Sequence, residues 1–274
     1  MKKKTVNIFI SISLIIVVAI FIYPSVSNYI YTEKADKIIE SYNKAVNDMS
    51  KDEIEKRMEV AHKYNNAVIY GEKYKYKIKD PYRENQKRDE FGNYSKMLEI
   101  NGIIGYISIP EINVKLPVYS GGSQEIIEDG IGHIRESTLP VGGKNTHSIL
   151  AGHRGTVKAK FFLELNKLKL GDKFFINNAG GKMAYEVDQI KVIEPDDFRD
   201  MQVERGQDYV TLITCTPYLT NTKRLIVRGH RTAYSEEDEI REREKGKVLS
   251  VINIFKAILI VVAVLILRRI LIKI

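Results

Sequence analysis

The chain has 274 residues, with 43 Lys and Arg against 35 Asp and Glu, which gives a formal charge of +8. Six of the positive charges lie in the terminal segments 2–4 and 268–273, and the region between them has no arginine-rich stripe with interleaved aromatic residues. This distribution of positive charges argues against a nucleic-acid partner, and we expect the basic termini to contact anionic membrane lipid.

An apolar segment without charged residues covers Val6 to Tyr23, shortly after three N-terminal lysines. Its length is close to the ~20 residues that a bilayer-spanning helix needs. A secretory signal peptide has a similar pattern, but the nearest candidate for a small-residue cleavage site is the poorly matching stretch 24–27. We therefore predict that residues 1–23 form an uncleaved membrane anchor, with a signal peptide as the alternative.

A second apolar segment, 248–267, lies between a charged linker, 236–247, and a basic tail, 268–274. Lys256 interrupts the segment and weakens the prediction, although a lysine near one end of a span can reach the membrane interface with its side chain. We predict a C-terminal transmembrane helix here. Basic residues at the outer ends of both apolar segments favour two cytoplasmic tails, which leaves residues 24–247 outside the cell.

Residues 24–69 are predicted to be helical, because apolar residues recur at helical spacing at Ala35, Ile38, Ile39, Tyr42 and Ala45. Ser50 and Glu53 have the spacing of a capping box, in which each side chain binds the backbone N–H of the other residue. A second helix is therefore expected from Ser50 toward Asn66. The alternative for this region is a plain spacer between the membrane and the rest of the chain.

Residues 70–99 have no period, and their charges, tyrosines and turn residues are typical of a surface loop or linker. From residue 100 to 235, short apolar runs are separated by Gly and Asn pairs, which predicts a mainly β domain, either a small barrel or a sandwich. The predicted strands are Ile103–Ile109, Val114–Tyr119, His147–Ala151, Lys173–Ile176, Lys182–Ile193, Tyr209–Thr214 and Arg224–Arg228.

Cys215 is the single cysteine of the chain, so it has no intrachain disulfide partner in the predicted extracellular region. It is buried and inert, bonded to another molecule, or chemically active, and burial is common for free cysteines. A cysteine nucleophile needs a histidine partner and a donor that stabilises the oxyanion. Whether Cys215 is inert, bonded or active therefore depends on whether such a histidine and such a donor lie near it.

His153 is the best histidine candidate among His62, His133, His147, His153 and His230. It follows a predicted strand and lies between Gly152 and Gly155, where small neighbours let another segment approach closely. His147, at the start of the same strand, remains an alternative, and His62 is expected on a solvated helix surface.

The predicted strand after the cysteine alternates charged and apolar residues, so Arg224 and Arg228 share one face. A hairpin through residues 216–223 would bring Arg224 near Cys215, where a protonated guanidinium could donate to a carbonyl or an oxyanion. The alternative is a solvated barrel exterior with two ordinary arginines.

The stretch Thr211-Leu-Ile-Thr-Cys215 resembles the TLxTC signature of sortases, the cell-surface transpeptidases of Gram-positive bacteria. The resemblance extends to Leu150-Ala-Gly-His-Arg-Gly155, to Gly105-Tyr-Ile-Ser-Ile-Pro110 and to the arginine nine residues after the cysteine, and covers roughly residues 100–232. It implies a sortase-type eight-stranded β-barrel with short helices. It also implies that Cys215 is the nucleophile, His153 the general acid and base, and Arg224 the positioning or oxyanion-stabilising donor.

Other features resemble class C, the pilin-polymerising sortases: Thr216-Pro-Tyr218, Leu139-Pro-Val-Gly-Gly143, the N-terminal extension and the C-terminal apolar segment. Class C enzymes often carry a lid with an Asp-Pro-aromatic motif. The resemblance implies that Asp80, Pro81 and Tyr82 form this lid, with Asp80 paired to an active-site arginine and Tyr82 over the thiol. The chain departs from the pattern at Tyr82, where Phe or Trp is common, and at 119–123, which replaces a His-Gly-Thr stretch.

The activity that the resemblance implies is cleavage of an LPXTG-like sorting signal between Thr and Gly through a thioacyl intermediate. A lysine amine of a pilin would then resolve the intermediate, without a metal or other cofactor. One alternative is a sortase of another class, which anchors surface proteins to peptidoglycan. A different kind of alternative is a non-catalytic membrane-tethered binding domain in which Cys215 is simply buried.

Overall fold

A computed structural model of the chain describes residues 3–71, 78–82, 94, 96–156, 159–242 and 244. Its centre is a closed barrel of eight strands in the order β1-β2-β3-β4-β7-β8-β6-β5, which confirms the predicted mainly β fold. The strands are β1 (Gly105–Ile109), β2 (Val114–Ser120), β3 (Ile131–His133), β4 (Thr146–Ala151), β5 (Lys173–Asn178), β6 (Gly181–Ile193), β7 (Asp208–Thr216) and β8 (Lys223–Thr232).

Short helical elements lie in the barrel connections, as the family resemblance implies. They are the helix α3 (Gln124–Asp129) and the 3₁₀ turns η2 (Pro110–Ile112), η3 (Leu165–Lys167) and η4 (Arg199–Met201). The helix α3 begins four residues after β2 ends and leads directly into β3, so it forms the connection between two strands that pair in parallel.

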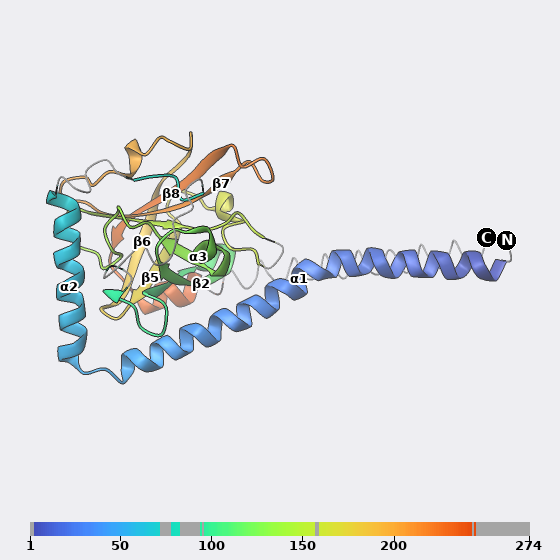
Figure 1. Ribbon diagram of the computed structural model, residues 1–274, viewed down its shortest axis with the longest axis horizontal. Helices are drawn as coiled ribbons and strands as arrows, with labels where there is room; N and C mark the ends of the chain where they lie inside the picture. The colour runs from blue at the N-terminus through green and yellow to red at the C-terminus, as the bar shows by residue number, and fades with distance from the viewer. Residues whose placement is uncertain are drawn as a thin grey trace.

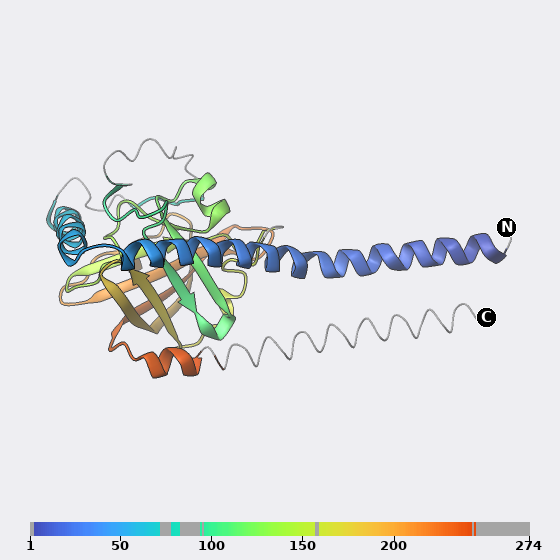
Figure 2. The same cartoon turned by 90° about the horizontal axis from the view of Figure 1, so that it is seen from below.

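Two longer helices precede the barrel. The helix α1 (Lys3–Asn47) runs along the barrel and then projects beyond it toward the N-terminus, and α2 (Lys51–Tyr70) stands at a steep angle to α1 (Figures 1 and 2). Ile39 and Tyr42 of α1 are buried in the main hydrophobic core. The predicted capping box is confirmed, because Ser50 Oγ accepts from Glu53 N–H and Ser50 N–H donates to Glu53 Oε2 at 3.0 Å.

Within the described residues, no helix combines the length and the apolar character that crossing a bilayer requires. The membrane anchor predicted within residues 1–23 therefore stays a prediction. The second predicted span, 248–267, and the basic tail after it lie outside the described residues.

The strands β7 and β8 pair antiparallel, and each contributes to two hydrophobic clusters on opposite faces. Leu212 and Val227 are register partners within the larger cluster, whereas Ile213 and Ile226 are register partners in a second, smaller cluster. Because side chains alternate along a strand, Cys215 lies on the same face of β7 as Ile213. The side chains around the cysteine therefore pack on the second cluster.

Candidate functional site

Cys215 on β7 is the direct cross-strand partner of Arg224 on β8. The two strands are joined by the short connection 217–222, as the hairpin predicted from the sequence requires. Cross-strand partners in an antiparallel pair have Cβ atoms about 5 Å apart on one face of the sheet. Cys215 is 7 % exposed and Arg224 is 3 % exposed, so the thiol and the guanidinium lie together in a largely dry environment.

His153 reaches the same place through the parallel pairing of β4 with β7. The pairing continues past the end of β4, since Gly152 N–H donates to Ile213 O at 3.1 Å and Thr214 Oγ1 donates to Gly152 O at 2.7 Å. The residue after Gly152 therefore lies beside the residue after Thr214. The structure thus brings His153 next to Cys215, although the two are 62 residues apart in the sequence.

The segment that carries His153 turns away from β7 immediately afterwards. Arg154 Nη1 donates to Thr216 Oγ1, so hydrogen bonds join the two segments on both sides of the His153–Cys215 neighbours. Gly155 then has φ of +78°, in the left-handed region that favours glycine. Gly155, two residues after His153, is therefore required by the turn.

Residues 78–82, which we call the lid segment, cover the thiol and the arginine. Arg224 donates from Nε to Asp80 Oδ1 at 2.9 Å and from Nη2 to Asp80 Oδ2, and both side chains are buried. This is a two-bond pair between a guanidinium fork and a carboxylate, the strongest common form of charge-assisted hydrogen bond. Tyr82 N–H also donates to Asp80 Oδ1, at 3.3 Å, so the carboxylate shapes the lid turn as well.

Tyr82 lies over the place where β7 and the segment that carries His153 pair with each other. Its hydroxyl lies 2.7 Å from Gly152 O and 2.8 Å from Ile213 O, and its ring centroid is 6.1 Å from that of His153. The Arg224 guanidinium lies over the other part of the ring, 5.0 Å from its centroid, in cation–π geometry. A phenylalanine could not bond the two carbonyl oxygens, so the departure from the usual lid residue adds contacts here.

The lid segment needs a close approach to the barrel at Pro81. A Cβ atom added to Gly122 would lie 2.7 Å from Ile134 Cδ1 and 3.3 Å from Pro81 Cβ, so Gly122 leaves room for both the second cluster and the lid segment. Ile78 and Tyr82 pack on the second hydrophobic cluster, which consists of Ile127, Ile134, Ile149, Ala151, Ile193, Met201, Ile213 and Ile226. The lid segment is therefore held by an ion pair, hydrogen bonds and apolar contacts together.

The closed arrangement keeps the thiol and the imidazole neutral. Burial raises the pKa of Cys215 to about 11; the Arg224 charge opposes this and the Asp80 charge adds to it. Burial lowers the pKa of His153, and only the Glu128 carboxylate of α3 opposes that shift among the causes that act on it. At neutral pH the resting pair is therefore a thiol beside a neutral imidazole.

The alternative histidine has a structural role. His147 Nε2 lies 2.7 Å from Thr211 Oγ1 and Nδ1 lies 2.9 Å from Gln202 O, and burial lowers the pKa of His147 to about 4. Thr211 precedes Cys215 by four residues of extended strand, a distance of ~13 Å. His147 therefore lies too far along the sheet to serve the thiol, and the site contains His153 instead.

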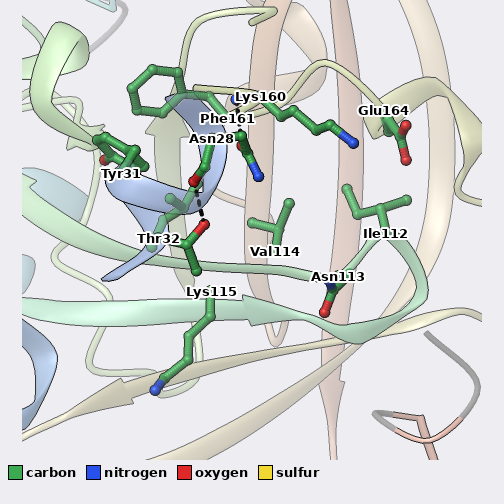
Figure 3. Close-up of a pocket in the computed structure, with 11 residues that line it drawn as sticks. Asn28, Tyr31, Thr32, Ile112, Asn113, Val114, Lys115, Lys160, Phe161 and Glu164 are labelled. Atoms are coloured by element: carbon green, nitrogen blue, oxygen red, sulfur yellow. Dashed lines mark hydrogen bonds between the residues drawn. The ribbon is translucent and has the colours of Figure 1, made fainter. Parts of the chain in front are cut away.

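A cavity of about 40 Å³ lies where α1 meets the barrel (Figure 3). This space holds no more than a few water molecules, so it is not a substrate site. Among the described residues, no three His, Cys, Asp or Glu side chains are grouped as metal ligands. One wall of the cavity is Phe161, whose ring centroid lies 6.5 Å from that of His153.

Phe161, Glu128 and Gly122 belong to the surroundings of the site but are not marked as such in the sequence. Phe161 lies eight residues and Glu128 25 residues from His153 in the sequence, and their action on His153 depends on how the chain between them folds. Gly122 is required by two neighbours, Ile134 and Pro81, that only the folded chain brings beside it. Their local sequences carry no motif that indicates these contacts. The Gly121-Gly122 pair reads as a turn, and nothing in the sequence links it to Pro81.

Comparisons with known proteins agree on one family. A family model described as the sortase domain matches residues 107–232. Sortase A of Bacillus anthracis is 32% identical over 132 residues, which cover 48% of this chain and 61% of that protein, so the chain matches less than two thirds of that relative's length. Among solved structures, sortase C of Streptococcus pneumoniae is 39% identical with a TM-score of 0.68, and the match covers 73% of this chain and 98% of that one. A pilus-related sortase C of Group B Streptococcus is 42% identical with a TM-score of 0.66, covering 71% and 97%.

The lid segment should control the reactivity of the thiol. In Asp80→Ala or Tyr82→Ala, we expect Cys215 to react with iodoacetamide on the order of tenfold faster or more at neutral pH, because loss of the buried pair or of the ring weakens the closed state. The pH midpoint of the reaction should also fall from about 11 toward the ordinary cysteine value, since burial is the main cause of the raised pKa. Intact-mass measurements over time give both quantities.

The matched control for this prediction is Asp52→Ala, which removes an exposed carboxylate at the start of α2. Its labelling rate should equal that of the unchanged chain. If both lid variants also label at that rate, with the same pH midpoint, the lid segment does not shield the thiol.

Proposed function

Because the chain belongs to the sortase family of cysteine transpeptidases, we propose that it cleaves an LPXTG-like sorting signal between Thr and Gly and joins the threonine to the amine of an acceptor molecule. The observation that carries the proposal is the position of one thiol, Cys215, directly across from Arg224 and beside His153. The three side chains come from β7, β8 and the segment after β4, so the closed barrel holds them in one arrangement.

In the first half of the reaction, Cys215 Sγ attacks the threonine carbonyl carbon and loses its proton to His153. Arg224 donates to the oxyanion that forms, in a site where low water content makes such a donor effective. When the C–N bond breaks, the His153 imidazolium gives its proton to the leaving glycine amine. The product is a thioester between the threonine and Cys215.

In the second half, a neutral amine of the acceptor attacks the thioester carbonyl, and His153 accepts the proton that this amine loses. Arg224 again donates to the oxyanion. The C–S bond then breaks, and the Cys215 sulfur recovers the proton from His153. The new bond is an amide, so no metal, redox partner or nucleotide is needed to balance the reaction.

Substrate entry requires the lid segment to leave. Asp80 occupies the Nε and Nη2 donors of Arg224, and Tyr82 covers the space over the thiol. A sorting signal must replace both, offering its carbonyl oxygen to the arginine in place of the carboxylate. The closed state is therefore an inhibited resting state of the proposed enzyme.

We propose that the acceptor amine is a pilin lysine, as in a class C sortase. Support comes from the class C structural neighbours, one of them described as pilus-related, and from the Asp80-Pro-Tyr82 lid segment. The similarity to a sortase A favours a second candidate, in which the acceptor amine belongs to peptidoglycan. The chemistry at Cys215 is the same in both candidates, so only the acceptor distinguishes them.

We also propose that the chain is anchored to a cell membrane with its barrel outside. Support comes from the basic and apolar segments at both ends of the sequence and from the Gram-positive source of the relatives. Protease added to intact cells should then digest the barrel. A barrel that is digested only after the cells are broken would contradict this orientation.

Cys215→Ala should abolish cleavage of an LPXTG peptide, because no other thiol is present in the chain. Arg224→Met should lower kcat by roughly 10²–10³-fold, the usual effect of removing an oxyanion donor. Both changes are best made in a Tyr82→Ala chain and measured by chromatography of the peptide products. Arg205→Met, at an exposed position, is the control and should leave kcat unchanged. Turnover retained in Cys215→Ala would rule out the mechanism.

Incubation of the full chain with a pilin that carries a sorting signal should give a ladder of covalent oligomers on a denaturing gel. The ladder should disappear when the acceptor lysines of the pilin are changed to arginine. Linkage of the same signal to a peptidoglycan stem amine, with no ladder, would favour the second candidate. A chain that neither cleaves the signal nor forms a thioester would be the non-catalytic binding domain.

A further inference from the structure

Phe161 has a backbone conformation that its residue type disfavours. Its φ is +40°, in the left-handed region, and its side chain is only 2 % exposed. Bulky residues rarely adopt this conformation, and where they do, the surrounding structure imposes it, often near a functional site. The contacts of Phe161 therefore indicate what the conformation is for.

One contact of Phe161 leads to the histidine of the proposed site. The ring lies edge-on to the His153 imidazole, with centroids 6.5 Å apart and planes at 62°. The next residue, Phe162, donates its N–H to His153 O at 3.0 Å. The segment around Phe161 thus supports both the backbone and the ring of His153.

The other contact of Phe161 leads to α1. The Tyr31 ring lies edge-on to Phe161 with centroids 4.9 Å apart, and both residues line the cavity of Figure 3. Directly before Phe161, Lys160 N–H donates to Asn28 Oδ1 at 3.0 Å. One turn of α1 therefore holds the Phe161 segment by an aromatic contact and a hydrogen bond.

Tyr31 also holds a second element near the histidine. Its hydroxyl donates to Asp129 O at 2.7 Å, at the last residue of α3. The preceding residue, Glu128, is the carboxylate whose charge acts on the pKa of His153. Tyr31 is thus connected to His153 indirectly in two ways, by its contact with the Phe161 ring and by its hydrogen bond to the end of α3.

We propose that α1 positions the His153 imidazole against Cys215, with Tyr31 and Phe161 as positioning residues. The inference rests on the role proposed for His153 and goes beyond it, because it makes the N-terminal helix a working part of the site. The plain-spacer alternative for this region assigns α1 no such effect. A spacer would hold the barrel at a distance from the membrane without touching the reaction.

The proposal has an electrostatic consequence at His153. Among the described residues, Phe161 and Tyr82 of the lid segment lie near its ring, and the charge of Glu128 of α3 acts on it. Cys215 of β7, the cross-strand partner of Arg224 on β8, lies beside the backbone of His153. Burial is the main cause that lowers the pKa of His153, with Glu128 opposing it. Loss of the Tyr31 ring, which packs on Phe161, should therefore let water reach the His153 imidazole and raise the pKa of His153 toward its ordinary value.

Three single substitutions in the full chain test the proposal. Tyr31→Ala removes the ring and the hydroxyl, Tyr31→Phe removes the hydroxyl alone, and Tyr29→Ala removes a tyrosine of the same helix that is 66 % exposed. The pKa of His153 is read by NMR titration of histidine-labelled protein, with the resonance identified from His153→Gln. The kcat and KM for an LPXTG peptide are measured in parallel in a Tyr82→Ala chain.

For Tyr31→Ala we expect a raised His153 pKa and a kcat about tenfold lower at unchanged KM, since misplacement of a proton-transfer group lowers kcat. Tyr31→Phe should keep the ring contact, so its His153 pKa and its kcat should lie between those of Tyr31→Ala and those of the unchanged chain. Tyr29→Ala should match the unchanged chain in both measurements. If Tyr31→Ala has the same His153 pKa and kcat as Tyr29→Ala, the proposal is wrong.

The pKa measurement separates this proposal from the proposed function. If the unchanged chain cleaves no sorting peptide, the proposed function fails while the effect of Tyr31 on the His153 pKa can still be observed or refuted. Phe161→Leu provides a second variant that keeps an apolar core side chain. It should raise the His153 pKa as Tyr31→Ala does, and an unchanged pKa in this variant would also overturn the proposal.

Discussion

The Arg224 guanidinium is the group on which the rest of the site depends, because a buried positive charge has to be paired at all times. Nη1 donates to Asn221 O and Lys223 O at 2.9 and 2.8 Å, which ties the arginine to its own hairpin. Nε and Nη2 donate to Asp80. Removal of one partner from a buried ion pair typically costs about 3–5 kcal/mol. Departure of Asp80 is therefore costly unless another acceptor replaces it, and in the proposed reaction the carbonyl oxygen of the sorting signal would be that acceptor.

This requirement links substrate entry to activation of the thiol. While Asp80 and Tyr82 are in place, burial and the Asp80 carboxylate both raise the pKa of Cys215, and only Arg224 lowers it. Departure of the lid would remove the Asp80 charge and reduce the burial, while the lowering influence of Arg224 would remain. The thiol thus becomes easier to deprotonate when a substrate can reach it. If the lid shields the thiol as proposed, a low reactivity of Cys215 in the resting protein would be a property of the lid and would not show that the cysteine is inert.

Local sequence predicted those parts of the structure that depend on neighbours in the chain. The Ser50 capping box and the hairpin that pairs Cys215 with Arg224 both join residues close in sequence, so spacing was sufficient. The choice between His147 and His153 was different. It depends on the parallel pairing of β4 with β7, which no local pattern specifies, and local reasoning left it open.

The contacts of the lid segment with Arg224, and those of Phe161 with His153, could not be predicted from the local sequence pattern. Asp-Pro-Tyr reads as an ordinary turn, and only the family resemblance connected Asp80 with an active-site arginine. Phe161 lies in a stretch with no periodic signal, and its left-handed backbone is imposed by contacts with α1 and His153. The contact between Tyr31 and Phe161 joins residues 130 positions apart, so it emerges only from the folded chain.

The proposed function requires Cys215 to form a thioester with the threonine of a sorting signal, and intact-mass spectrometry can detect this acyl-enzyme. The full chain with Tyr82→Ala is mixed with an LPXTG peptide in the absence of an acceptor amine and quenched in acid. The account predicts a mass increase equal to the peptide up to its threonine, located by digestion on the fragment that contains Cys215 and removed by hydroxylamine. Cleavage of the peptide without this adduct, or an adduct on any other residue, would contradict the account.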